Sequence, residues 1–410
     1  MGTYAPASAL GWLDLDAAAS DRAAVLLRAF DEPGTLDPLG LGSVRDVFSN
    51  VFAPGTSTIQ TRLRYFLFVP WICQGLERAR VAPANFAGRL RADEARLIQQ
   101  LRHLGPNRGV QGYSAGRELR RMPSEAYWGG IGSWGIRRLD LSIREYGRQL
   151  PHLSGRTVEL DDDRNPIGTS RSMWATLPPP PEGFLNRPVD FDLTADEAVV
   201  LIDHIRRLHP QSLLAHACRS PADAASAEQP WDLRTGQLPP FLQEALHHAR
   251  CVSELTLGPQ HVYNLLLAQR ATSELGWDTT VVTAAIEADL DAWVSVVDER
   301  SGELSGWVSD IKSFWSYVAR HDTIAAPSIS FITEIVTRAA QDPARFVNDP
   351  AVHQLIRDRE IRLKAGRARL GPRAALETWN QARFGGPLVY RWPTARGYLG
   401  DLGRALAGAA

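Results

Sequence analysis

Apolar residues in this chain recur at helical spacing over long stretches and seldom alternate as they do in a strand. Between residues 84 and 104, leucine and phenylalanine return at helical spacing with arginines and acids between them, which predicts an amphipathic helix. Residues 240–275 predict a long helical stretch that is broken at Gly258 and Pro259. The best candidate for a strand is the short segment 156–160. We therefore expect a mainly α fold.

Breaks in the helical pattern divide the chain into two halves. With 410 residues the chain exceeds one ordinary hydrophobic core, so two or three domains are expected. The helical pattern fails near residue 150 and resumes at Thr194, which forms the sequence pattern of a capping box with Glu197. We expect an N-terminal helical domain over residues 1–150, a Pro-rich connector over 151–192 and a C-terminal helical domain over 193–410.

The expected connector contains three consecutive aspartates at 161–163 and four consecutive prolines at 178–181. Neither run suits a regular helix or a central strand, so we expect this segment to lie on the surface. The aspartates lack the spacing of a calcium loop and are best explained as a solvated acidic turn. A proline run of this kind acts as a stiff spacer or, less commonly, as a ligand for a partner domain.

Charge, cysteines and hydropathy limit the function classes. The net charge is −1, so binding to nucleic acid or to a membrane would have to come from a local patch. The three cysteines are far apart and form no CxxC pair, which argues against disulfides and a zinc ribbon and for a reducing compartment. The longest apolar run, residues 65–73, is far shorter than the ~20 residues of a membrane span. We expect a cytoplasmic protein that does not enter the membrane.

Motifs of common catalytic sites are missing from the sequence. It contains no nucleotide-binding P-loop, no nucleophile elbow, no HExxH pair and no histidine–lysine pair with phospholipase D spacing. The spacing of His204, His209 and His216 does not suit a metal site, and the adjacent His247 and His248 are expected to be structural. We expect no catalytic residues, no metal and no cofactor, although an active site assembled from distant residues stays open.

Residues 109–138 combine basic and aromatic side chains in an unusual block. The pattern predicts one short helix over 114–121 and a second that begins near Ser124, joined by a tight turn at Pro123, in the outline of a helix-turn-helix. Arginines bind phosphates in a bidentate way and aromatic rings stack on bases, so this block could contact a nucleic-acid backbone. Alternatively, the aromatic residues form a small core and the arginines a solvated face. The candidate nucleic-acid-binding residues are Arg117, Arg120, Arg121, Arg137 and Arg138.

Several segments together resemble a known family. They are GWLDLD near the start, PGTSTIQTRLRYFLFVPWI at 54–72, the block that ends in WGI at 134–136, HVYNLLLAQR at 261–270 and YRWPTARGYLGDL at 390–402. The second of these closely resembles the signature of an uncharacterised bacterial family that is catalogued as a domain of unknown function, and the resemblance covers essentially the whole chain. It implies no established activity. Such proteins are similar to ones encoded near helicases and nucleases in antiphage defence regions, which implies a helicase or nuclease as a partner.

The signature segment carries more polar residues than a helix cap needs. A cap uses one or two side chains, and the surplus could bind an anion at the helix N-terminus. The alternative is that Arg62 and Arg64 pair with acids such as Asp46 and lock the N-terminal core. The candidate anion-binding residues are Thr56, Ser57, Thr58, Gln60, Arg62 and Arg64.

These observations favour one function and leave two alternatives. The leading expectation is an accessory, non-catalytic component of a bacterial antiviral defence system that binds DNA or RNA, a protein partner, or both. The first alternative is a metal-dependent nuclease or other hydrolase, and the second is a structural subunit of a larger complex. A basic groove without convergent acids would favour the binding protein, convergent oxygen ligands in a cleft would favour the enzyme, and a broad apolar patch would favour the subunit.

Overall fold

The computed structural model describes residues 37–115, 119–154, 159–160, 166–167, 173–234 and 238–408. Helices make up most of these residues, so the expectation of a mainly α fold is confirmed. The strands β1 (Glu159–Leu160) and β2 (Pro166–Ile167) form one short antiparallel pair, and β1 lies inside the predicted segment 156–160. The α-helices are α2 (Gly42–Phe52), α3 (Tyr65–Arg78), α4 (Pro83–Leu101), α5 (Pro123–Ser133), α6 (Ile143–Ser154), α7 (Ala195–Leu208), α8 (Leu213–Ala217), α9 (Pro221–Ala224), α10 (Pro240–Leu275), α11 (Thr280–Glu299), α12 (Ser301–Ser309), α13 (Ile311–Ala319), α14 (Ala326–Gln341), α15 (Pro343–Asn348), α16 (Pro350–Lys364), α17 (Arg373–Leu376) and α18 (Trp392–Ala407).

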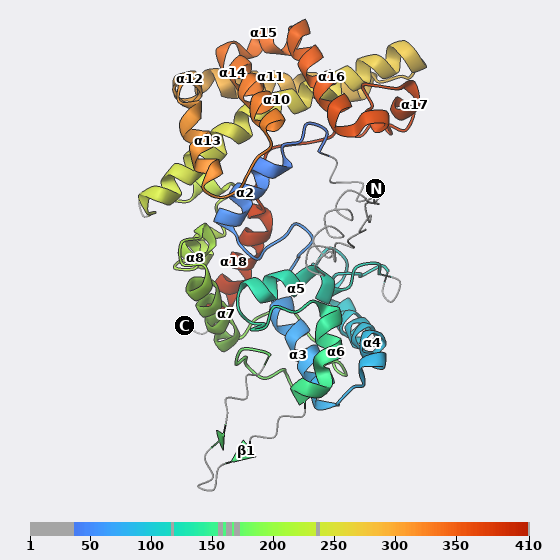
Figure 1. Cartoon of the computed structure of the whole chain (residues 1–410), viewed down its shortest axis with the longest axis vertical. Helices are drawn as coiled ribbons and strands as arrows, with labels where there is room; N and C mark the ends of the chain where they lie inside the picture. Colours follow the sequence, from blue (N-terminus) through green and yellow to red (C-terminus); the bar gives the residue numbers. More distant parts are fainter. Residues whose placement is uncertain are drawn as a thin grey trace, which may run out of the picture.

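The first described helix, α2, and the residues that lead into the last one, α18, meet in the middle of the molecule, where Arg391 contacts Asn50 at 3.0 Å. Helices α3 to α6 form one end and α10 to α17 form the other, with α2, α7, α8 and α18 between them (Figure 1). The C-terminal α18 packs on α7 and α9, and α2 packs on α8 and α10. Contacts therefore cross the boundaries proposed at residues 150 and 192, and the division into two domains stays a prediction.

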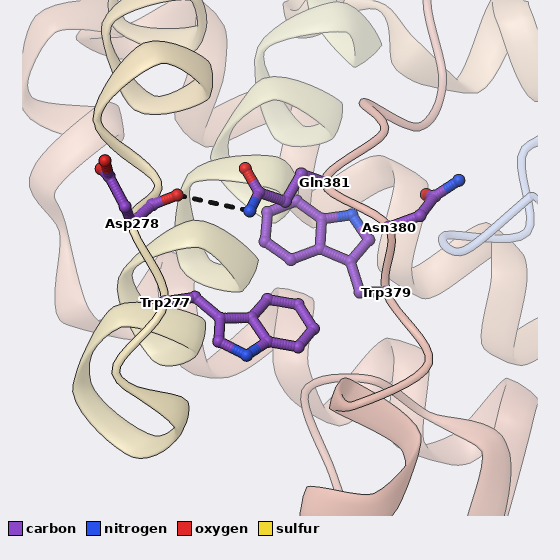
Figure 2. A pocket seen from close by; sticks show the side chains of 5 residues that line it. All are labelled: Trp277, Asp278, Trp379, Asn380 and Gln381. Carbon is purple, nitrogen blue, oxygen red and sulfur yellow. Dashed lines mark hydrogen bonds between the residues drawn. The ribbon is translucent and has the colours of Figure 1, made fainter.

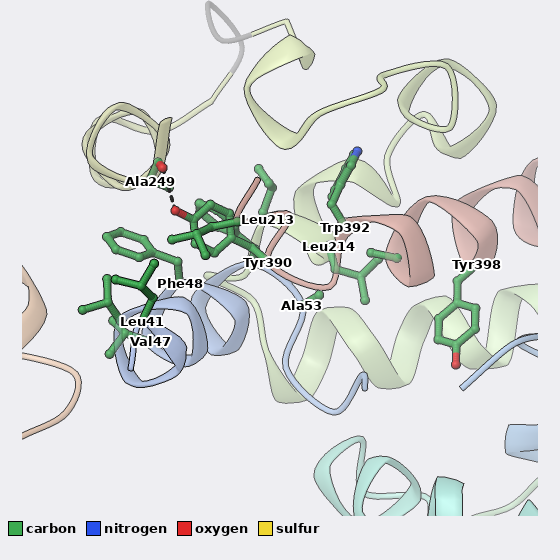
Figure 3. Close-up of a cluster of buried hydrophobic side chains, with 14 of the residues drawn as sticks. Leu41, Val47, Phe48, Ala53, Leu213, Leu214, Ala249, Tyr390, Trp392 and Tyr398 are labelled. Atoms are coloured by element: carbon green, nitrogen blue, oxygen red, sulfur yellow. Dashed lines mark hydrogen bonds between the residues drawn. The ribbon is translucent and has the colours of Figure 1, made fainter. Parts of the chain in front are cut away.

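An aromatic cluster holds this middle layer together. The ring of Phe48 from α2 lies 5.5 Å from the ring of Tyr390, whose hydroxyl donates a hydrogen bond of 2.6 Å to the carbonyl of Ala249 on α10 (Figure 3). Leu213 and Leu214 of α8 are fully buried in the same cluster. The indole of Trp392, at the start of α18, donates to the carbonyl of Ala227. Segments from both ends of the chain thus share one hydrophobic core.

The apolar run at residues 65–73 forms the buried first part of α3, as expected from its composition. The proline run at 178–181 forms neither helix nor strand, and its first residue contacts this helix, since Trp71 donates a hydrogen bond of 2.9 Å to the carbonyl of Pro178. The ring of Phe184 then contacts both Phe68 and Trp71. The aspartates at 161–163 lie outside the described residues. No helix in the described part of the chain is both long and apolar enough to cross a membrane.

Two expectations about helices are corrected. Helix α10 continues through Pro259, although a break was predicted there. Tertiary packing of α10 against α11 offsets the cost of a proline inside the helix. The glycine at 258 has no side chain, so the ring of Trp293 from α11 packs directly on α10, and a Cβ at this glycine would lie 2.3 Å from that ring. The Trp293 indole also donates a hydrogen bond of 2.8 Å to the carbonyl of Glu254.

The block at 109–138 does not form a helix-turn-helix in its described residues. Residues 109–115 and 119–122 form turns and bends, and the only α-helix they lead into is α5. Gly109 and Gly112 adopt left-handed backbone angles (φ 85° and 73°), which end a helical path rather than begin one. Pro123 is the first residue of α5, and the backbone N–H of Ser124 donates to the carboxylate of Glu94 on α4 at 2.6 Å.

Candidate functional site

Most of the polar residues in the signature segment hold the C-terminal helix. Gln60 is buried, donates to the carbonyl of Ala126 and accepts a hydrogen bond of 3.0 Å from the hydroxyl of Tyr398 on α18. The backbone carbonyl of Thr56 accepts from Arg391, and that of Ser57 accepts from the side chain of Thr394. Thr58 is exposed. Two of the segments that carry the family resemblance, at 54–72 and 390–402, are thus joined in the fold.

The two arginines of the signature pair with acids far along the chain. Arg62 contacts Asp401 of α18 at 2.9 Å, and Arg64 contacts Asp190 and Glu197, each at 2.9 Å. Pairing with acids was the alternative to anion binding that the sequence left open, with Asp46 as a suggested partner. The arginines do pair with acids, but Asp46 is not one of them. Asp46 lies beside Arg45 and Arg391 instead. Anion binding by the signature segment stays a prediction that no described contact supports.

The candidate arginines of residues 109–138 differ in environment. Arg137 is buried, donates to the carbonyl of Leu139 and packs its guanidinium 5.3 Å from the ring of Trp128, so it acts as a structural residue. Arg120 and Arg138 are exposed and Arg121 is partly exposed, whereas Arg117 lies outside the described residues. Arg138 lies close enough to His204 on α7 to help lower the pKa of that imidazole, although burial is the main cause. Arg138 therefore lies near a second basic surface, on α7, which the sequence did not predict.

This basic surface is a groove between α7 and the segment 210–219, with a volume of about 600 Å³. Three arginines and one histidine line it, together with one acid, Asp203, and four small or apolar side chains. Arg207 lies 3.8 Å from Asp203, but in the described part of the chain neither Arg206 nor Arg219 forms an ion pair. The lining residues are Val199, Ile202, Asp203, Arg206, Arg207, Pro210, Ala215, His216 and Arg219.

Local sequence explains why these side chains converge. The predicted capping box forms, with Thr194 accepting from the N–H of Glu197 at 3.2 Å and Glu197 accepting from the N–H of Thr194 at 3.1 Å. The helix buries Ala198, Leu201 and Ile205 and turns its opposite face to solvent. After Pro210, the hydroxyl of Ser212 caps α8 and carries the chain back beside α7.

The groove carries more positive than negative charge in its described lining, which holds three arginines and one acid, Asp203. Burial lowers the pKa of His216, and repulsion from Arg219 and Arg206 lowers it further. Both guanidinium groups therefore lie close enough to the imidazole to disfavour its charged form. A bound anion would relieve this repulsion and satisfy the free arginine forks.

The other two histidines of this region are structural. The imidazole of His204 contacts the carbonyl of Trp134 at 2.8 Å, and His209 contacts the carbonyl and the hydroxyl of Ser133, each at 2.9 Å. Both histidines therefore provide hydrogen-bond partners for backbone carbonyl groups at the C-terminal end of α5. The arginines near these histidines lack the accompanying aromatic residues that mark residues 109–138, so the sequence did not predict the groove. The sequence pattern that indicates the groove is two consecutive arginines at 206–207, a helix break at Pro210 and a third arginine at 219.

A second pocket, of about 580 Å³, lies between the end of α10 and the segment after α17 (Figure 2). It is lined by two tryptophans, Trp277 and Trp379, and by Asp278, Asn380 and Gln381. The Trp379 ring is buried, and the side chain of Gln381 donates to the carbonyl of Asp278 at 3.3 Å. Its described lining contains no cation, so it does not suit a phosphate.

Comparisons with known proteins define the family and nothing beyond it. The model of the family of unknown function DUF6361 matches residues 7–406. No curated protein and no solved structure matches the chain. Any function must therefore be argued from the residues themselves.

Proposed function

The chain belongs to DUF6361, a family of unknown function, and we propose that it binds nucleic acid through the basic groove between α7 and α8. The observation that carries the proposal is that Arg206 and Arg219 flank His216 without an ion-pair partner among the described residues. A guanidinium group presents a fork of N–H donors that matches phosphate oxygens. Exposed, unpaired arginines around one groove are the arrangement that a phosphodiester backbone requires.

Neighbouring side chains extend the match to a nucleotide. Phe241, in the first turn of α10, is 41% exposed and its ring lies 6.5 Å from that of His216, so a base could stack beside the groove. Val199 is 56% exposed and supplies an apolar wall for a sugar or base. Arg138 is exposed and, like the groove residue Arg207, lies near His204, so it adds positive charge to this region. Aromatic rings interleaved with arginines are typical of single-strand binding surfaces.

The groove favours binding over hydrolysis. Its single carboxylate, Asp203, lies beside Arg207, so the described lining provides no second acid with which to hold a catalytic divalent ion. Among the described residues, the large exposed apolar side chains are spread over four helices, which disfavours a purely structural subunit. They belong to α7, α10, α11 and α16 and are Val199, Leu208, Phe241, Val281, Val296, Ile361 and Leu363.

An accessory role in bacterial antiviral defence, beside a helicase or nuclease, remains part of the proposal. It rests on the resemblance of the sequence segments and not on a contact in the structure. Co-purification with proteins encoded nearby, with and without nuclease treatment, would separate a bridging nucleic acid from a direct protein contact. Loss of the partner after nuclease treatment would support the groove as the link.

The direct test is a binding isotherm. Fluorescently labelled single-stranded DNA, duplex DNA and RNA would be titrated with the protein and with the double variant Arg206→Glu/Arg219→Glu. We expect the variant to bind at least about tenfold more weakly while its melting temperature stays unchanged. The matched control is Arg357→Glu/Arg362→Glu, which reverses two exposed arginines of α16, at the end of the molecule that α10 to α17 form. Equal binding by the groove variant and the protein would overturn the proposal.

A further inference from the structure

Three potential metal ligands converge at a second place, outside the groove. His247 and Cys251 are one helical turn apart on α10, and Glu303 reaches them from α12. The imidazole Nδ1 of His247 lies 3.1 Å from a carboxylate oxygen of Glu303 and 3.9 Å from the Sγ of Cys251. All three ligand atoms lie within 4.8 Å of one another. From this geometry we infer that His247, Cys251 and Glu303 form a binding site for a zinc ion.

The spacing of the atoms matches a tetrahedral zinc site. Zinc bonds to sulfur at ~2.3 Å and to nitrogen or oxygen at ~2.0–2.2 Å, so ligand atoms in a tetrahedron lie about 3.3–3.6 Å apart. The two separations that involve Nδ1 bracket this range. Small rotations of the side chains of His247 and Glu303, which are 44% and 46% exposed, would bring all three atoms onto one ion.

The donor set selects the class of ion. One thiolate, one imidazole and one carboxylate are the ligand types that zinc takes, whereas magnesium and calcium prefer oxygen alone. Coordination would replace the thiol proton of Cys251, which leaves to solvent, by a bond from sulfur to the metal. The partial exposure of His247 and Glu303 would leave a fourth position for water.

Arg300 fixes the orientation of Glu303. Its guanidinium contacts the other oxygen of that carboxylate at 2.7 Å and also pairs with Glu254, so the oxygen nearest His247 stays directed at the imidazole. Hydrogen-bonded carboxylates of this kind are typical of metal sites. The adjacent His248 has a structural role, as expected, because it is buried and accepts a hydrogen bond of 2.9 Å from the indole of Trp307.

The same residues do not form a nucleophilic triad. A triad uses one imidazole nitrogen for the thiol and the other for the acid. Here the thiol and the carboxylate both approach Nδ1. Convergence on one nitrogen suits a shared ion and does not suit a proton relay. Cys251 is also fully buried, which keeps its sulfur away from a substrate.

Cobalt and zinc titrations test the site. Chelator-treated protein without a histidine tag would be titrated with Co²⁺, with a thiolate-to-cobalt charge-transfer band as the readout, and with Zn²⁺ by calorimetry. We expect one ion per chain, loss of the band in Cys251→Ser, and zinc affinity at least about tenfold weaker in His247→Ala and Glu303→Gln. Cys218→Ser, which alters a buried cysteine outside the group, should keep both signals.

The variants at His247 and Glu303 still test the site if Cys251→Ser fails to fold. His247→Ala and Glu303→Gln change partly exposed side chains, so both variants should fold normally. No zinc uptake by the protein would overturn the inference. Uptake that is unchanged in His247→Ala would do the same, because the ion would then lie elsewhere.

Discussion

Arg62 and Asp401 lie 339 residues apart in the sequence and share two hydrogen bonds in the structure, of 3.2 and 2.9 Å. The same carboxylate accepts from the backbone N–H of Leu63 at 3.1 Å, and only 2% of its side chain is exposed. One buried acid near the C-terminus thus fixes the segment that enters α3. The two segments that carry the family resemblance, at 54–72 and at 390–402, therefore bind each other in the fold. We call this contact the interlock.

We expect Asp401→Asn to destabilise the whole fold. The substitution removes a charge that Arg62 and Leu63 require, and breaking a buried pair costs about 3–5 kcal/mol. Chemical denaturation followed by circular dichroism measures the loss. Asp46→Asn changes a carboxylate that is 46% exposed and lies 3.2 Å from Arg45 and 3.7 Å from Arg391, so it should cost less than about 1 kcal/mol. A similar small loss at both positions would refute the interlock.

Glu94 should make stability depend on pH. Burial raises the pKa of this carboxyl group to about 7 in the fold, whereas an unfolded glutamate titrates near ~4.3. A raised pKa gives stability that is complete below the unfolded value and is lost as pH rises through about 7. Glu94→Gln removes the charge and can still accept from Ser124.

The variant should therefore be more stable than the natural chain at about pH 8, by roughly 2 kcal/mol, and the difference should shrink toward about pH 5. Thermal melts across this range provide the measurement. A gap that stays constant with pH would show that the carboxyl group does not titrate in this way.

Two glycine-to-alanine changes should have opposite effects. In Gly258→Ala the new Cβ would lie 2.3 Å from the ring of Trp293, so we expect a loss of about 1–3 kcal/mol. A Cβ at Gly306 of α12 meets nothing within 4 Å, so Gly306→Ala should raise stability by about 0.5–1 kcal/mol. The midpoint of denaturant unfolding shows whether each variant is more or less stable than the natural chain. Unchanged stability of Gly258→Ala would contradict the close packing of α10 on α11.

Nucleic-acid binding should tighten as pH falls. Burial and the adjacent Arg219 and Arg206 lower the pKa of His216, so the free groove holds a neutral imidazole near neutral pH. A phosphate raises that pKa, binding then takes up a proton, and affinity increases as the pH falls below neutral. Isotherms of His216→Gln should lose part of this increase. An identical pH dependence in both proteins would place the titrating group elsewhere.

The sequence predicted helices well where their signals are local. Caps, apolar periodicity and punctuation depend on neighbouring residues, which is why the capping box at Thr194 and the buried run at 65–73 form as expected. The errors arise where distant residues decide. Helix α10 passes through Pro259 because Trp293 packs against Gly258, and no local pattern reveals that contact.

The candidate sites were harder to predict for the same reason. The sequence identified Arg62 and Arg64 as special, yet their partners at 401, 190 and 197 become neighbours only in the fold. The groove needs α7 and the segment after Pro210 to lie side by side, and the metal-ligand group needs α12 to meet α10. Linear spacing alone could not bring Glu303 to His247.

The salt dependence of nucleic-acid binding tests the central claim most directly. Each phosphate contacted by an arginine contributes about −0.9 to the slope of log affinity against log salt for duplex DNA, or about −0.7 for single strands. We predict a slope of roughly −2 to −4 for the natural chain, made shallower by about 2 in Arg206→Glu/Arg219→Glu and unchanged in Arg357→Glu/Arg362→Glu. Binding that is absent, or a slope that the groove variant leaves unchanged, would contradict the assignment of this groove to nucleic acid.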